Sequence, residues 1–196
     1  MQDKVLADAE FLGRWDYTDT YLDTVTFALT IQDIWLRSRG ALFQLKVPIR
    51  KNLTDNKRLA SYYDQLDTEE DIRKQLNLAP DGSLAEDIEA AGYVPCAAFT
   101  TTRSKYRKEG FILDDDFMDF DYRMLKIRRE EDEGEQNEAA EKKIMDFAGR
   151  YKLVEVPLRQ KVIECIRRFS PTHYNSLATA GLVDKREGML GKILPK

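Results

Sequence analysis

Basic side chains recur at every second position in separate stretches of the sequence. Arg37 and Arg39 form one such pair, and Arg103, Lys105 and Arg107 form a longer series. Because alternate side chains of a β-strand point to the same face, each series lies on one face if its stretch is a strand. Forked arginine donors and compact lysine charges suit the closely spaced oxygens of a polyphosphate. The chemistry that this spacing predicts is the binding of a polyphosphate chain.

Lys46, Lys126 and Arg128 extend the pattern, because they alternate with apolar residues such as Leu45 and Ile127. If helices cover the apolar side, these cations point into the lumen of a barrel. The chain has a formal net charge of −4, so a local concentration of positive charge is unfavourable unless an anion offsets it. The solvated faces of a half-exposed sheet are the alternative, which the sequence leaves open.

Asp114 and Asp116 lie one strand period apart and therefore share a face. Their hard carboxylate oxygens are ligands that Mg²⁺ or Mn²⁺ prefers. Asp115, Asp119 and Asp121 follow closely, so a solvated acidic turn is the alternative.

His173 is the only histidine, which excludes a histidine pair for acid–base catalysis and a histidine-rich metal site. Its position just after Pro171 predicts a surface or capping residue at the start of a helix. Cys96 and Cys165 do not form a CxxC motif, so we expect inert core thiols rather than a disulfide or zinc site.

Tyr21, Trp35 and Tyr62 are aromatic residues that could stack on an organic base of a ligand. Aromatic residues in strands belong to the core more often than to a ligand site, so we expect core roles for them.

Alternating patterns and turn residues predict about seven strands, with helices between and after them. Strand-like segments begin near residue 16 and include 34–39, 42–47, 59–66, 97–107, 111–116 and 119–128, with turns at Gly40 and Gly110. Helices are expected after the capping residues Thr68 and Ser83, near 139–151, after Pro157 and after Ser170. This order predicts the α+β class.

A chain of 196 residues is long enough for one substantial core, and we expect a single domain over 1–183 and a flexible tail over 184–196. The net charge of −4 argues against nucleic acid and membrane surfaces as partners. We expect a cytoplasmic monomer, because the sequence shows no signal peptide and no apolar run of about 18 residues.

Several motifs resemble those of the thiamine triphosphatase branch of the CYTH, or triphosphate tunnel, family. The first series is D-T-Y-L-D-T at 19–24, W-L-R-S-R at 35–39 and Q-L-K at 44–46. The second is Y-Y-D at 62–64, T-R-S at 102–104, D-x-D at 114–116, and Lys161 before R-F-S-P at 168–171. The resemblance extends from about residue 16 to residue 177.

The resemblance implies an antiparallel β-barrel whose tunnel holds a small-molecule triphosphate while water attacks the terminal phosphorus. It gives catalytic roles to Asp114, Asp116 and Lys161, and metal roles to Asp114, Asp116 and Asp64. It gives phosphate-binding roles to Arg37, Arg39, Lys46, Arg103, Arg107, Lys126 and Arg128. Mg²⁺, or Mn²⁺, is the implied cofactor. We expect Arg37, Arg39, Lys46, Arg103 and Lys161 to converge within one enclosed cavity.

Two departures from the family pattern weaken the catalytic interpretation. The E-x-E-x-K motif of the family's first strand is absent, so we expect a barrel without that strand. Lys126-Ile127-Arg128 stands where the family has a G-E-V-E segment, so two acids are replaced by bases. Metal binding would be weakened or lost, which leaves two alternatives to an enzyme: a non-catalytic module that binds polyphosphate or a nucleotide, and an inactive fragment.

Overall fold

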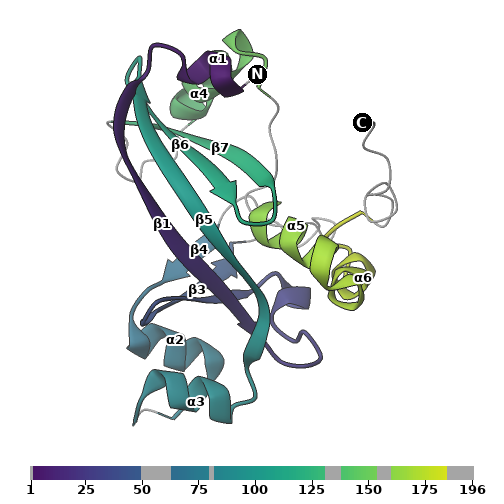
Figure 1. The fold of residues 1–196 in the computed structure, drawn as a ribbon. Coiled ribbons are helices and arrows are strands. Elements are labelled where there is room, and N and C mark those ends of the chain that lie inside the picture. The colour runs from purple at the N-terminus through teal and green to yellow at the C-terminus, as the bar shows by residue number, and fades with distance from the viewer. Residues whose placement is uncertain (1, 50–62, 80–81, 131–137, 154–159, 185–196) are drawn as a thin grey trace. The chain divides into compact units, whose positions relative to one another are not determined.

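The computed structural model describes residues 2–49, 63–79, 82–130, 138–153 and 160–184 (Figure 1). The second half of the predicted strand at 59–66 is present, but its first half and Tyr62 lie outside the described residues. The predicted helix start at Pro157 and the tail over 185–196 also lie outside them. In the part of the chain that the structure describes, none of the helices has the length and apolar composition of a membrane span.

Within the described residues, seven strands form one sheet in the order β4-β3-β2-β1-β5-β6-β7. The pairs β1–β2, β2–β3, β3–β4, β5–β6 and β6–β7 are antiparallel. The strands are β1 Glu10–Asp23, β2 Trp35–Arg39, β3 Leu42–Pro48, β4 Tyr63–Leu66, β5 Val94–Lys108, β6 Phe111–Met118 and β7 Tyr122–Arg129. The predicted α+β class, with an antiparallel sheet and flanking helices, is confirmed.

The chain divides into two compact units, which are described separately. The β6–β7 unit comprises residues 1–17 and 100–156, and the β2–β4 unit comprises residues 18–99 and 157–196. Two of the three boundaries, at 17/18 and 99/100, fall within the long strands β1 and β5, and the third lies outside the described residues. The assignment of 1–183 to a single domain stays a prediction.

The core of the β2–β4 unit lies between the β2–β3 hairpin and two helices, α2 Glu69–Leu76 and α3 Leu84–Ala90. Leu36 and Leu45 are fully buried and belong to one cluster with Ile72 of α2 and Ile88 of α3. The predicted packing of the Leu45 face under helices is therefore confirmed. It leaves the opposite face of the hairpin to the basic residues.

The two predicted helix caps differ in outcome. Thr68 caps α2, because its hydroxyl oxygen accepts a hydrogen bond from the Asp71 amide at 3.2 Å. Ser83 precedes α3 but makes no capping hydrogen bond with its side chain. Gly40 closes the β2–β3 hairpin with a φ of 58°, as expected for a turn residue in the left-handed region.

The core of the β6–β7 unit is a cluster of Val5, Phe111, Leu113 and Phe147. Val5 belongs to α1 Gln2–Leu6 and Phe147 to α4 Glu138–Arg150, so residues from these two helices pack against one face of the strands. Ile127 packs on this cluster. Because alternate residues point to opposite faces, Lys126 and Arg128 are directed away from it, as the sequence pattern predicted.

His173 is fully buried, so the prediction of a surface or capping residue is wrong. It lies in the first turn of α6 Pro171–Thr179, which follows α5 Gln160–Phe169. Its Nε2 is 2.7 Å from Thr30 Oγ1 in the short helix η1 Thr30–Gln32, and its ring stacks on Phe27 with centroids 3.9 Å apart. The first turn of α6 faces the β1–β2 connection rather than solvent, which local sequence pattern does not reveal.

The predicted core residues are largely where we expected them. Trp35 is 1% exposed and Tyr21 is 7% exposed, and their rings pack edge to face. Cys165 is buried and Cys96 half-buried, and neither forms a disulfide. Burial, with the charge of Asp23, raises the pKa of Cys96 to about 12, as expected of an unreactive thiol.

Candidate functional site

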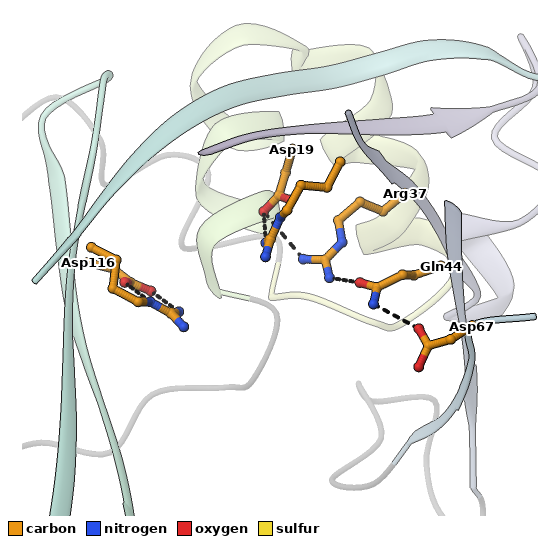
Figure 2. A network of polar contacts seen from close by, with 7 residues as sticks. Asp19, Arg37, Gln44, Asp67 and Asp116 are labelled. Carbon is orange, nitrogen blue, oxygen red and sulfur yellow. Dashed lines mark hydrogen bonds and ion pairs between the residues drawn. The ribbon is translucent and has the colours of Figure 1, made fainter. Parts of the chain in front are cut away.

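Arg37 and Arg39 share one buried counter-ion, Asp19, in the β2–β4 unit (Figure 2). The Asp19 carboxylate accepts from Arg39 Nε at 2.8 Å and from Arg37 NH1 at 3.3 Å. Asp19 itself is only 2% exposed. Arg37 also donates to Gln44, which donates in turn to Asp67 at 2.8 Å. The two guanidinium groups are therefore held in place by a connected set of hydrogen bonds.

This arginine pair keeps hydrogen-bonding capacity for an anion. The Nε atom of Arg37 is buried and has no hydrogen-bond partner. A buried donor without an acceptor is unfavourable, and an oxygen of a bound anion would satisfy it. This property suits the binding of a phosphate group.

Lys46 lies on the same face as Arg37, but Asp64 does not. Lys46 is the cross-strand partner of Gln65, whereas Asp64 pairs with Val47, which lies on the face of Leu45. Directly opposed residues of an antiparallel pair point to the same side. Asp64 is therefore exposed on the face away from Lys46. Its support of a metal site stays a prediction, because Asp114 and Asp116 belong to the other unit.

A second cluster lies in the β6–β7 unit, where Arg103 binds two buried aspartates. Arg103 Nε and NH2 donate to the two oxygens of Asp116 at 2.6 and 2.7 Å, and NH1 is 3.1 Å from Asp114 Oδ2. Asp114 is 3% exposed and Asp116 is 1% exposed. Burial acts to lower the pKa of Arg103, but the hydrogen bond and charge of Asp116 outweigh it, so the pKa is raised and the guanidinium stays charged. The predicted pairing of Asp114 and Asp116 on one face is confirmed.

Lys126 stands directly opposite Asp114 in the β6–β7 register. Desolvation lowers the pKa of Lys126, and repulsion from Arg103 and Arg128 adds to it, while Asp114 and Asp116 oppose the shift. Lys126 is nonetheless an exposed residue. A cation crowded by other cations is stabilised when an anion arrives.

The carboxylates leave one oxygen for a divalent metal. Arg103 engages both oxygens of Asp116 and one of Asp114, and the remaining atom, Asp114 Oδ1, is buried without a hydrogen-bond partner. No group of three or more histidine, cysteine or acidic residues suited to a metal occurs among the described residues. Mg²⁺ commonly uses one or two carboxylates together with substrate phosphates and water. The residues therefore fit a metal that arrives with a phosphate, rather than one held by protein ligands alone.

The other predicted phosphate ligands lie on more open surfaces. Arg107 forms ion pairs with Glu10 at 3.1 Å and Glu130 at 2.7 Å, and the hydrogen bond that Arg107 donates to Glu10 is the main reason that the pKa of Arg107 is raised. Arg128 is exposed. Lys161 lies in the first turn of α5 and is half-buried.

The five cations predicted to converge are divided between the two units. Arg37, Arg39, Lys46 and Lys161 belong to the β2–β4 unit, and Arg103 belongs to the β6–β7 unit. Their convergence on one cavity stays a prediction.

A bound anion is not the only group that compensates these cations, contrary to the prediction from sequence. Asp19 pairs with Arg37 and Arg39, and Asp114 and Asp116 pair with Arg103. Sequence reasoning recognised Asp19 only as part of a motif and missed it as the counter-ion. The available signal was that Asp19 lies two residues before Tyr21 and so shares its strand face, and Tyr21 is the cross-strand partner of Arg37.

The comparisons with known proteins agree with this fold. The family model described as the CYTH domain matches residues 4–158. PH1819 from Pyrococcus horikoshii OT3 is similar in structure at 17% identity, with 79% of this chain and 85% of that chain covered and a TM-score of 0.52. PH1012 from the same organism is 17% identical, with 79% and 83% covered and a TM-score of 0.49.

HpAC1 from Hippeastrum, which is described with a dominant triphosphatase activity, is 16% identical. That similarity covers 78% of this chain and 80% of the other, with a TM-score of 0.45. No curated protein matches the sequence. Because the family model covers most of the length, from before β1 to beyond α4, the chain belongs to the CYTH domain family.

Proposed function

We propose that the protein binds a small organic triphosphate and hydrolyses its terminal phosphate, in the manner of thiamine triphosphatase. Two buried atoms without hydrogen-bond partners, one in each unit, carry the proposal. Arg37 Nε is a donor that suits a phosphate oxygen, and Asp114 Oδ1 is an acceptor that suits a phosphate-bound cation. Each atom also lies on a strand face that carries several cations, which suits the binding of a triphosphate.

Phosphoryl transfer depends mainly on positioning and on neutralising the charge of the phosphate oxygens. Arg37 and Arg39 are fixed by Asp19, and Arg103 is fixed by Asp116, so these donors are preorganised and need little rearrangement when a phosphate binds. Lys46 and Lys161 would add point charges to phosphate oxygens. A divalent metal bound with the triphosphate would polarise the phosphoryl oxygens. Asp114 would hold that metal or orient the attacking water.

The test is phosphate release by Asp114→Asn with Mg²⁺ and thiamine triphosphate, ATP or inorganic triphosphate. We expect the rate to fall about a hundredfold, because removal of one charge from the reacting centre has effects of this order. Asp115→Asn is the matched control, since Asp115 lies on the opposite face and binds Arg123 at 2.8 Å. Equal rates for the Asp114 variant and wild type would remove Asp114 from the mechanism.

A non-catalytic module that binds polyphosphate or a nucleotide is the second candidate. It is favoured by Lys126, which stands opposite Asp114 where a second acid would serve a metal, and by Arg103, which occupies the other carboxylate oxygens. This alternative predicts salt-sensitive binding of inorganic triphosphate that persists in EDTA, without phosphate release. Calorimetry in Mg²⁺ and in EDTA separates the candidates. No binding in either condition would reject both.

A further inference from the structure

An exposed tryptophan lies beside the cations of the β6–β7 unit. Trp15 on β1 is 41% exposed, and the Nζ atom of Lys105 lies 5.0 Å from the centroid of its ring. Two residues further along β1, the ring of Tyr17 lies 5.5 Å from the Cζ atom of Arg103. An aromatic ring on β1 therefore accompanies each of two successive cations on β5.

The Trp15 ring lies close to Gly13 on the same strand. A Cβ atom at Gly13 would lie 3.5 Å from Trp15 Cζ3. The φ of Gly13 is +149°, a conformation that favours glycine. On the other face of the sheet, Asp16 accepts a hydrogen bond from the Thr102 hydroxyl at 2.5 Å, which joins β1 to β5 at this level. Much of the Trp15 ring stays open to solvent.

The other tryptophan is not available for stacking. Trp35 is 1% exposed, and its indole N–H donates to Asp33 at 2.8 Å. Trp15 is different, because its ring is exposed and lies next to Lys105, a cation suited to a phosphate oxygen. Side chains at successive positions on one strand face lie about 7 Å apart, a length that a short sugar or alkyl linker spans. A ring on Trp15 and a phosphate at Arg103 would therefore fit one small molecule.

We propose that Trp15 is a stacking platform for a planar heteroaromatic group carried by the triphosphate. The inference rests on the proposed function and adds the chemical class of the organic group. Stacking would cover the exposed indole surface, and the Lys105 ammonium would move from the ring to a phosphate oxygen. An exposed cation–π contact is weak, so this exchange has a low cost.

The affinity of Trp15→Leu for three probes tests the proposal by calorimetry. We expect binding of ATP and thiamine triphosphate to weaken about tenfold, the usual scale for loss of one base–aromatic stack. Inorganic triphosphate has no ring, so its affinity should stay unchanged, which also shows that the variant is folded. Phe11→Leu is the matched control, because Phe11 is 57% exposed on the same strand but contacts Tyr106 instead of Lys105.

Fluorescence gives a second measurement, because Trp15 and Trp35 are the only tryptophans in the chain. In the wild type, both organic triphosphates should change the tryptophan emission, and this change should be absent in Trp15→Phe. Inorganic triphosphate should not change the emission of the wild type. If Trp15→Leu weakens all three probes equally, or none, the stacking proposal is overturned while triphosphate binding stands. If the wild type does not bind inorganic triphosphate, the proposed function itself fails.

Discussion

Acidification should destabilise the β2–β4 unit through a single side chain, His173. Burial lowers the pKa of His173 to about 4 from an ordinary value of 6.5, although the charge of Asp23 acts in the opposite direction. The ring has no exposed surface, its Nε2 contacts Thr30, and its Nδ1 is buried without a partner. A proton added at Nδ1 would therefore place a charge where no acceptor receives it.

The size of the effect follows from the two pKa values. Because the folded pKa lies below the unfolded pKa, the unfolded chain binds the proton first as the pH falls. The contribution of neutral His173 is complete above about pH 6.5 and is lost progressively toward about pH 4. A shift of this size corresponds to about 3 kcal/mol of unfolding free energy.

The assay compares the wild type with His173→Gln in urea denaturation at a series of pH values between about 7 and 4. With Trp15→Phe introduced into both proteins, emission comes from Trp35 alone, which is buried in the unit that contains the histidine. Carboxylates titrate in both proteins, so the difference between them isolates His173, the only histidine. We expect the stability advantage of the wild type to shrink by about 3 kcal/mol as the pH falls. A difference that stays constant over this range would refute the reasoning.

Two further substitutions test the charge clusters. Asp19→Asn should destabilise the protein by about 3 kcal/mol, because it leaves Arg37 and Arg39 without their buried counter-ion. Thermal denaturation with and without inorganic triphosphate checks this, since the anion should restore more stability to the variant than to the wild type. Lys126→Glu should lower the Mg²⁺ concentration needed for half-maximal phosphate release severalfold, because it replaces a repelling cation with an acid opposite Asp114. An unchanged Mg²⁺ requirement would show that this position does not face the metal.

Strand periodicity predicted which way the side chains of the long strands point. Lys126 and Ile127 fall on opposite faces, and Leu45 packs under helices, because a two-residue period leaves no other choice once one face is buried. The role of Asp64 came from the motif resemblance instead, which did not reveal that Asp64 pairs with Val47 on the face of Leu45. Short strands carry too few alternations to fix their own register.

The remaining errors have a common physical origin, which is contact between residues distant in sequence. His173 contacts Phe27 and Thr30 from the other end of the chain, so its burial could not be inferred from its position beside Pro171. Asp19 reaches Arg37 and Arg39 across a strand pairing, and a sequence pattern shows charges without showing which of them pair. The sequence therefore showed which cations share a strand face, but it did not show that Asp19 pairs with Arg37 and Arg39.

The proposed metal dependence would follow from the charge of Asp114. Asp114 Oδ1 is buried and receives no hydrogen bond. Two unit negative charges about 4 Å apart repel by about 4 kcal/mol at an intermediate dielectric, which is an upper bound here because Arg103 pairs with Asp114. A divalent cation bound with the phosphate would offset this repulsion. Triphosphate should therefore bind Asp114→Asn more tightly than wild type in EDTA, and the order should reverse in Mg²⁺. If calorimetry shows the same order in both conditions, the phosphate does not lie beside Asp114, and the proposed catalytic role of that residue fails.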